Sequence, residues 1–254
     1  MNLNSGYPLA YNEPYDRIFD KRGNLYDLAM KQYPAVRKNE FAALFYNTPL
    51  KSTEHIIDLP SGGGYLKNHI PANVTVDSWE ISEGFAPSKD INYVNINRIS
   101  QDIKNKYDRG ACLASLHHTE DKVGFISQLA TLLKKSGIIN IADVAFESGV
   151  KDFLEIFVHE NNAMGHRGDY LSFEKPLHLS GNIEILRQEM VTVPWNFKDS
   201  ESCAEYCRLL FGLNGTTESY SIIHALDKYV GIEDLGSKGF NINWELMYID
   251  LLVN

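Results

Sequence analysis

A short apolar run that ends in an acid and leads into three glycines constrains the fold of this chain more than any other stretch. The run covers residues 55–59 (HIIDL), and the glycines are Gly62 to Gly64. Its β-branched and apolar residues predict a buried strand, and the glycines permit backbone angles that other residues avoid. A strand that leads through a glycine turn into a helix is how α/β proteins hold a nucleotide. The alternative is a flexible surface turn.

Short apolar strands alternate with helices after this turn. Strands are predicted at 74–80, 91–94, 111–116 and 138–143, and the helix with the clearest apolar stripe at 121–136. Lys134 and Lys135 would occupy the last turn of that helix, with Gly137 as its C-terminal cap. This alternation predicts a parallel sheet with right-handed crossovers.

The two ends of the chain differ from this central part. Residues 1–50 are predicted to be mostly helical, and so are residues 148–160 and 200–231. Two long, partly alternating stretches, 183–195 and 240–253, predict an antiparallel strand pair added to the edge of the sheet. The inserts between these strands are expected to lie over the carboxyl ends of the parallel strands, where open α/β sheets bind ligands.

Charge, N-terminal sequence and cysteine content exclude several classes of protein. The net charge is −9 and Lys and Arg form no cluster, which argues against binding nucleic acid through its phosphates. The N-terminus has neither the basic nor the apolar region of a signal peptide, and no apolar stretch approaches the length of a membrane span. The cysteines Cys112, Cys203 and Cys207 provide no disulfide framework and too few ligands for a structural zinc. We therefore expect a cytoplasmic protein without a bound metal.

Four motifs in order, DLPSGGG, VDSWE, ACLASLHHTED and LLKKSGIINIADV, resemble the class I S-adenosylmethionine-dependent methyltransferases over roughly residues 55–145. The resemblance implies a Rossmann-like, doubly wound α/β fold: a seven-stranded, mainly parallel sheet whose last strand is antiparallel. It also implies S-adenosylmethionine as cofactor and S-adenosylhomocysteine as product. Pro60 departs from the family pattern, because it stands where the family usually has its first glycine.

The resemblance places the cofactor against the ends of the first, second and fourth strands. Asp58 is expected to help bind its ammonium group, and Glu80 to accept hydrogen bonds from both ribose hydroxyls. Replacing Glu80 should therefore weaken cofactor binding with little effect on the unliganded protein. An acid at this position would also suit NAD, but the turn does not match the Gly-x-Gly-x-x-Gly dehydrogenase fingerprint. The remaining expected cofactor contacts are Pro60, Ser61, Gly62, Gly64, Ser115 and Leu116.

The acceptor of the methyl group is expected beyond the fourth strand. His117 and His118 end that predicted strand and are the catalytic candidates; the alternative is that the pair simply begins the next loop. Tyrosines near the N-terminus are similar to the aromatic lids of small-molecule methyltransferases, and the loop at 159–170 is polar enough to be merely solvated. The candidate acceptor-binding residues are Tyr11, Tyr15, Arg22, Tyr26, His166 and Arg167.

The sequence thus predicts a methyltransferase that moves a methyl group to a small molecule by in-line displacement. Residues 1–254 would form one domain, with a helical cap at 1–50, a cofactor-binding core at 55–145, and lid inserts with the final strand pair at 146–254. The protein would be a monomer or homodimer without nucleic-acid or membrane partners. Two alternatives remain: a non-catalytic methyltransferase-like assembly module and, less favoured, an NAD-dependent oxidoreductase.

Overall fold

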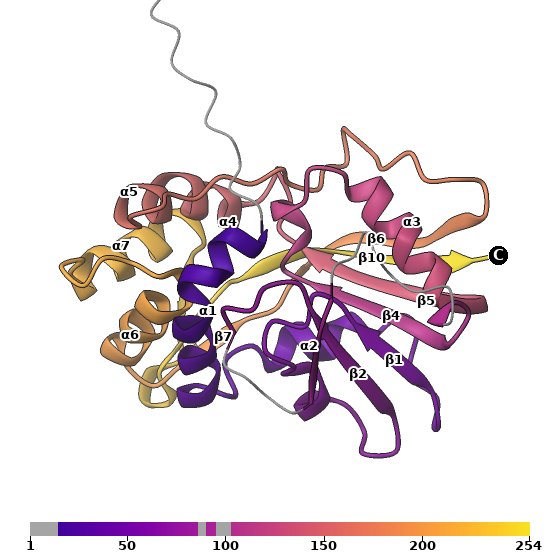
Figure 1. The fold of residues 1–254 in the computed structure, drawn as a ribbon. Coiled ribbons are helices and arrows are strands. Elements are labelled where there is room, and N and C mark those ends of the chain that lie inside the picture. Colours follow the sequence, from indigo (N-terminus) through magenta and orange to yellow (C-terminus); the bar gives the residue numbers. More distant parts are fainter. Residues whose placement is uncertain (1–14, 86–89, 95–102) are drawn as a thin grey trace, which may run out of the picture.

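A seven-stranded sheet forms the centre of the computed structural model, which describes residues 15–85, 90–94 and 103–254 (Figure 1). The strand order is β3-β2-β1-β4-β5-β10-β6. Strands β1 to β5 run parallel to one another, whereas β10 is antiparallel to both β5 and β6. The bounds are β1 His55–Asp58, β2 Thr75–Glu80, β3 Ile91–Tyr93, β4 Tyr107–Leu113, β5 Leu133–Asp143, β6 Ile183–Thr192 and β10 Glu245–Val253. The predicted fold class is confirmed.

The chain reverses its direction of winding between β1 and β4. From β1 the chain moves outward to β2 and β3, then crosses back to β4 on the other side of β1. Ligands of open α/β sheets bind in the crevice outside the carboxyl ends of the strands at such a point. The glycine turn after β1 and the residues after β4 therefore lie at the expected binding edge.

Helices gather at the carboxyl ends of the parallel strands, while α3 covers one face of the sheet (Figure 1). The contacts between α1 and α6 and between α6 and α7 tie the N-terminal helix to the late inserts. The helices are α1 Tyr15–Gln32, α2 Lys38–Leu44, α3 Lys122–Leu132, α4 Gly149–Asp152, α5 His159–Asn161, α6 Ser200–Phe211 and α7 Ser219–Tyr229, with a π-helical segment at Phe153–Val158 and 3-10 turns at Leu66–His69, Leu116–His118 and Gly236–Lys238. None of the described helices is long and apolar enough to cross a membrane.

Each of the two long C-terminal strands predicted from the sequence is broken in two. β7 (Trp195–Phe197), β9 (Phe240–Ile242) and β8 (Ile232–Asp234) form a separate antiparallel sheet in the order β7-β9-β8. Pro194 separates β6 from β7, because proline cannot donate a hydrogen bond to a central ladder. The strand pair itself is confirmed, but it is β6 that forms the edge and β10 that is inserted beside β5.

The helix predicted at 121–136 ends four residues early. α3 stops at Leu132, and Leu133 already pairs with Tyr107 as the first residue of β5. Residues between this pair and the next one, Arg109 with Ile138, bulge out of the ladder. Lys134, Lys135 and Gly137 therefore belong to the strand and not to the end of a helix, and Lys134 forms an ion pair with Asp108 at 2.7 Å. Tertiary pairing of the sheet overrides the local helical pattern here.

The fourth strand also differs from its predicted bounds. It ends at Leu113 rather than at residue 116, because Ala114 adopts a left-handed backbone conformation with φ of +51°. The two histidines that follow therefore lie on a 3-10 turn beyond the strand and not on the strand itself.

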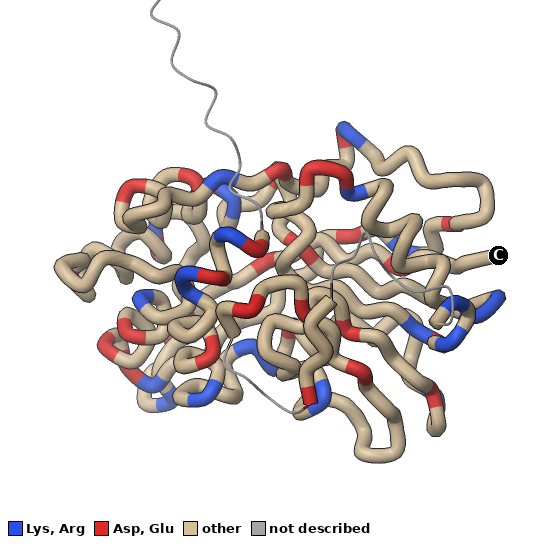
Figure 2. The backbone as a smooth tube through the Cα atoms, in the orientation of Figure 1, with Lys and Arg blue, Asp and Glu red and all other residues tan. Residues whose placement is uncertain are grey.

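Lys and Arg are distributed along the described chain with Asp and Glu between them (Figure 2). Several of the basic residues are held in ion pairs, including Lys106 with Asp77 and Arg109 with Glu54. Within the described residues the structure thus shows no basic stripe of the kind that binds a phosphate backbone.

Candidate functional site

The glycine turn after β1 is a fixed part of the site. All three glycines have left-handed backbone angles, with φ of +55°, +94° and +77° for Gly62, Gly63 and Gly64. A Cβ atom on Gly64 would lie only 3.2 Å from the Ser78 hydroxyl oxygen. The Ser61 N–H donates to a backbone carbonyl of β2 at 2.9 Å, so the turn is anchored to the sheet. These positions require glycine for conformation and for close approach.

Asp58, the last residue of β1, is buried with part of its carboxyl group left without a hydrogen-bond partner. Its side chain is 4% exposed, and among the described residues its Oδ2 atom has no hydrogen-bond partner. Burial raises the pKa of Asp58 well above its ordinary value, and the nearby Glu80 raises it further. A buried acid in this state is stabilised by any ligand that brings a positive charge.

Glu80, at the end of β2, is completely buried and fully engaged within the protein. Its Oε2 atom accepts hydrogen bonds from the Gly62 N–H at 2.7 Å and the Tyr15 hydroxyl at 3.3 Å. Its Oε1 atom accepts from the N–H groups of Ile81 at 2.8 Å and Ser82 at 3.1 Å. Helix α1 therefore covers this carboxylate through Tyr15. The sequence-based expectation was that replacing Glu80 would have little effect on the unliganded protein. Because four donors depend on this carboxylate, we now expect the replacement to lower the stability of the unliganded protein as well.

His117 and His118 are positioned by an acid that the sequence analysis did not select. Asp143, the last residue of β5, is completely buried and its Oδ1 atom lies 2.6 Å from His117 Nδ1. Its carboxylate also accepts from the backbone N–H groups of Leu116 at 2.5 Å, His117 at 3.2 Å and Val144 at 2.6 Å. Burial alone would raise the pKa of Asp143, but His117 and these donors hold it below its ordinary value. The sequence signal that could have identified Asp143 is its position at the end of a strand, which it shares with Asp58.

A third histidine joins this pair from the loop after α5. The ring centroid of His166 lies 5.6 Å from that of His117 and 5.3 Å from that of His118. The centroids of His117 and His118 are 4.0 Å apart. The loop is tied down because the Asp169 N–H donates to the His117 carbonyl at 2.8 Å. Burial lowers the pKa of both His118 and His166 well below the ordinary value, with a further contribution from His117 in each case.

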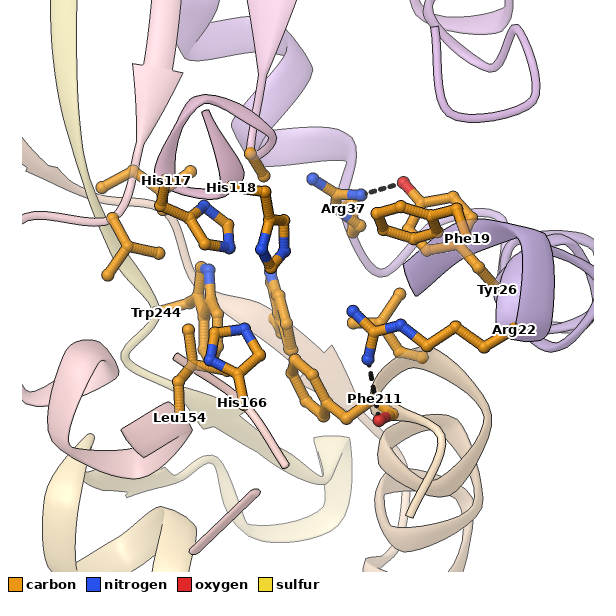
Figure 3. Close-up of a pocket in the computed structure, with 15 residues that line it drawn as sticks. Phe19, Arg22, Tyr26, Arg37, His117, His118, Leu154, His166, Phe211 and Trp244 are labelled. Atoms are coloured by element: carbon orange, nitrogen blue, oxygen red, sulfur yellow. Dashed lines mark hydrogen bonds between the residues drawn. The ribbon is translucent and has the colours of Figure 1, made fainter. Parts of the chain in front are cut away.

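Two cavities share a wall at this edge of the sheet. The first, beside the glycine turn, contains Asp58, Gly62 and Ser115, and the second contains the three histidines (Figure 3). Phe19, Tyr26, Arg37 and Ala114 line both. Because these residues face both spaces, a group bound in one cavity is close to a group bound in the other.

Aromatic rings form most of the wall of the second cavity. Trp195 and Trp244 stack at 3.9 Å between ring centroids, and Phe211 packs 6.3 Å from Trp195. Trp195 is fixed from behind, because its Nε1 donates to the Glu40 carboxylate at 2.5 Å. Such walls suit a flat, apolar ligand with a few polar groups.

Arg22 adds a positive charge to this cavity. Its Nη1 donates to the Phe211 carbonyl at 2.9 Å, whereas its buried Nε has no partner among the described residues. Burial lowers the pKa of Arg22 to about 10, so the guanidinium is still charged at neutral pH. In Figure 3 Arg22 faces the histidines from the opposite side of the cavity. A ligand between them meets the guanidinium on one side and imidazole nitrogens on the other.

Most of the predicted site residues lie along these two cavities. The first cavity is lined by Asp58, Pro60, Ser61, Gly62, Ser115, Tyr15 and Tyr26, and the second by Arg22, Tyr26, His117, His118 and His166. Gly64 and Leu116 pack within the protein, and Arg167 is exposed, so these three and Glu80 do not line either cavity. Tyr11 lies outside the described residues.

The sheet order, the antiparallel β10 and the glycine turn after β1 are those of the class I S-adenosylmethionine-dependent methyltransferase fold. Solved structures with this fold superpose on most of the chain. They include an S-adenosylmethionine-dependent methyltransferase of Thermotoga maritima at 12% identity, covering 94% of this chain and 99% of that one with a TM-score of 0.57. Coclaurine N-methyltransferase, solved with S-adenosylhomocysteine, has 10% identity, coverage of 85% and 70%, and a TM-score of 0.52.

The [4+2]-cyclase SpnF is similar to the same extent, with 12% identity, coverage of 94% and 96%, and a TM-score of 0.60. No protein-family model and no curated protein sequence matches the chain. Because a cyclase and methyltransferases share this fold, the fold alone does not fix the reaction.

Proposed function

We propose that this protein transfers a methyl group from S-adenosylmethionine to a small acceptor bound in the aromatic, histidine-lined cavity. The observation that carries the proposal is the shared wall between the two cavities. A cofactor held at Asp58 and the glycine turn would direct its methyl group past Ala114 toward the second cavity. Methyl transfer needs the sulfonium, the methyl carbon and the attacking atom in line at close range, which two adjoining cavities can supply.

The chemistry of each cavity supports its proposed ligand. The unpaired Asp58 carboxylate suits the ammonium of the cofactor. His118 lines the second cavity and its Nδ1 has no partner among the described residues, so it can accept a proton from an acceptor that must lose one. Stacked Trp195 and Trp244 would hold a flat acceptor, and the Arg22 guanidinium would favour one that carries negative charge.

The helical layer of α1, α4, α6 and α7 is proposed to act as a lid. The Tyr15 hydroxyl occupies a position on Glu80 that a ribose hydroxyl would take, so cofactor entry requires α1 to shift. Closure of the same helix would then exclude water from the transfer reaction, as lids commonly do.

The cofactor proposal makes a direct prediction. Calorimetric titration should show that S-adenosylhomocysteine binds with one site per chain and that NAD does not, because the glycine turn approaches its ligand without the helix N-terminus that a pyrophosphate needs. Production of S-adenosylhomocysteine with aromatic acids, phenols and amines would then identify the acceptor class. Binding of NAD without any response to S-adenosylhomocysteine would overturn the proposal. Cofactor binding without turnover on any acceptor would instead favour the non-catalytic module.

Asp58→Asn should stabilise the unliganded protein and weaken cofactor binding. Because burial raises the pKa of Asp58 in the folded state, folding takes up a proton, and stability falls as pH rises from the ordinary aspartate range toward the folded-state pKa. The amide removes this dependence but cannot pair with an ammonium. We expect a higher melting temperature at pH 7 and roughly a tenfold or greater loss of S-adenosylhomocysteine affinity by calorimetry. Unchanged affinity would show that Asp58 does not contact the cofactor.

A further inference from the structure

We propose that His117, His118 and His166 bind one divalent transition-metal ion, with Zn²⁺ as the best match, in the histidine-lined cavity. All three side chains are buried, and one ring nitrogen of each lies within 4.8 Å of the other two. The histidines come from two segments almost fifty residues apart, so no metal-binding spacing was visible in the sequence. This proposal replaces the sequence-based expectation that the protein binds no metal.

The distances between the rings are close to those that one metal ion imposes. With Zn–N bonds of about 2.0–2.1 Å and tetrahedral angles, three ligand nitrogens lie about 3.3 Å apart. The ligand nitrogens, at most 4.8 Å apart, would have to move together by about 1.5 Å or less to reach this separation. His118 has a further reason to bind an ion, because its buried Nδ1 has no hydrogen-bond partner among the described residues. Coordination of the three rings would also organise polar groups that are otherwise costly to bury together.

The groups behind the histidines are those that orient metal ligands. A metal-bound histidine usually donates its second ring N–H to a carboxylate or carbonyl, which fixes the tautomer and the direction of the ring. Asp143 is such a carboxylate for His117, with 2.6 Å between its Oδ1 and His117 Nδ1. Three backbone N–H groups hold Asp143 itself in place. On the other side, the Tyr170 hydroxyl lies 3.4 Å from His166 Nδ1. The nitrogens that remain, including Nε2 of His117, are available to an ion.

The arrangement leaves a coordination position open to the cavity. Three protein ligands with a free fourth position are typical of catalytic rather than structural zinc sites. Arg22 adds positive charge across the same cavity, so the fourth ligand should be an anion. Resting on the proposed function, this identifies the acceptor class as a small molecule with an ionisable hydroxyl or thiol on a flat apolar body.

The metal would then take over the activation of the acceptor. Coordination lowers the pKa of the hydroxyl or thiol, whose proton leaves to solvent, and the bound oxygen or sulfur keeps the electron pair. That pair attacks the methyl carbon, the bond between this carbon and the sulfonium sulfur breaks, and the sulfur retains its electrons in S-adenosylhomocysteine. The methylated product is neutral at this atom and binds the cation less well, which favours release. His118 acts as a ligand in this state and not as a base.

Metal binding can be tested without cofactor or acceptor. Chelator-treated protein is titrated with Zn²⁺ by calorimetry and with Co²⁺ by visible absorption, which reports tetrahedral nitrogen ligation. We expect one ion per chain, with affinity reduced about 100-fold or more in His118→Ala and His166→Ala, and 10–100-fold in Asp143→Asn. His178→Ala, an exposed histidine outside the cluster, should bind as the wild type does. Circular dichroism and thermal melts establish that each variant is folded.

The outcomes separate the metal site from the methyltransferase proposal. Absence of stoichiometric Zn²⁺ and Co²⁺ binding by the wild type, or equal affinity in wild type and His166→Ala, would overturn the metal site. Stoichiometric binding lost in the cluster variants and kept in His178→Ala would support it, even if S-adenosylhomocysteine did not bind. Failure of cofactor binding with an intact metal site would count against the proposed function alone.

Discussion

Glu80→Ala is expected to weaken S-adenosylhomocysteine binding at least tenfold and to lower the free energy of unfolding of the unliganded protein by roughly 3 kcal/mol. The loss of affinity follows from the removal of the acid that would accept the ribose hydroxyls. The loss of stability follows from three backbone N–H groups, those of Gly62, Ile81 and Ser82, which lose their acceptor in a buried environment. For a chain of this length the melting temperature should fall by roughly 6–12 °C.

Glu83→Ala is a matched control, because Glu83 is exposed in the same segment and has no such donors among the described residues. It should change neither the melting temperature nor the affinity measurably. Thermal melts of the two variants measure the change in stability, and calorimetric titration measures the change in affinity for S-adenosylhomocysteine. If Glu80→Ala bound S-adenosylhomocysteine within twofold of the wild type, the acid would be a structural residue that holds the glycine turn and α1, without a contact to the ribose.

The fold was predictable because its signals are local. The apolar runs that form β1, β2 and β5 each end in an acid, and their order along the chain is sufficient to predict a parallel sheet with a binding edge. Errors arose where long-range pairing decides the outcome. The ladder between Tyr107 and Leu133 ends α3 early, and Pro194 divides a stretch that otherwise alternates like one strand. Neither the pairing partner nor the consequence of a single proline can be read from hydrophobic periodicity.

The candidate site was less predictable, because its residues meet only in the folded chain. The glycine turn and the two adjacent histidines are contiguous motifs, and both line the cavities. His166 was selected for its polar loop, while its neighbour Arg167 in the same loop is exposed. Trp244 and Phe211 were missed, since nothing in their local sequence distinguishes a cavity wall from ordinary core packing. Asp143 was missed although it ends a predicted strand, as Asp58 does.

Arg37 and Glu40 illustrate this limit most clearly. They form a buried ion pair, with Glu40 Oε2 at 2.6 Å from Arg37 Nη2 and 2.9 Å from Arg37 Nε, and Arg37 lines both cavities. Arg37 also donates to the Tyr26 hydroxyl, and Glu40 accepts from Trp195 Nε1. The pair therefore connects α1, α2 and the aromatic wall. In sequence the two residues are an ordinary helical pair three positions apart.

Glu40→Ala is accordingly expected to lower the free energy of unfolding by about 3–5 kcal/mol, because the Arg37 guanidinium is left buried without its counter-charge. Thermal and urea denaturation measure this loss, and calorimetry measures S-adenosylhomocysteine binding under conditions where the variant is still folded. The affinity should fall as well, since Arg37 and Trp195 lose the group that holds them beside the two cavities.

The double variant Arg37→Met with Glu40→Gln distinguishes an energetic role of this pair from a positional one. It removes the buried charge and keeps an acceptor for Trp195 Nε1, so most of the stability lost in Glu40→Ala should return. In this variant the Tyr26 hydroxyl loses the Arg37 donor, and we expect the cofactor affinity to stay low. Recovery of both properties would show that the ion pair does not shape the site. A loss of less than 1 kcal/mol in Glu40→Ala would show that water or a rearranged Arg37 compensates for the missing carboxylate.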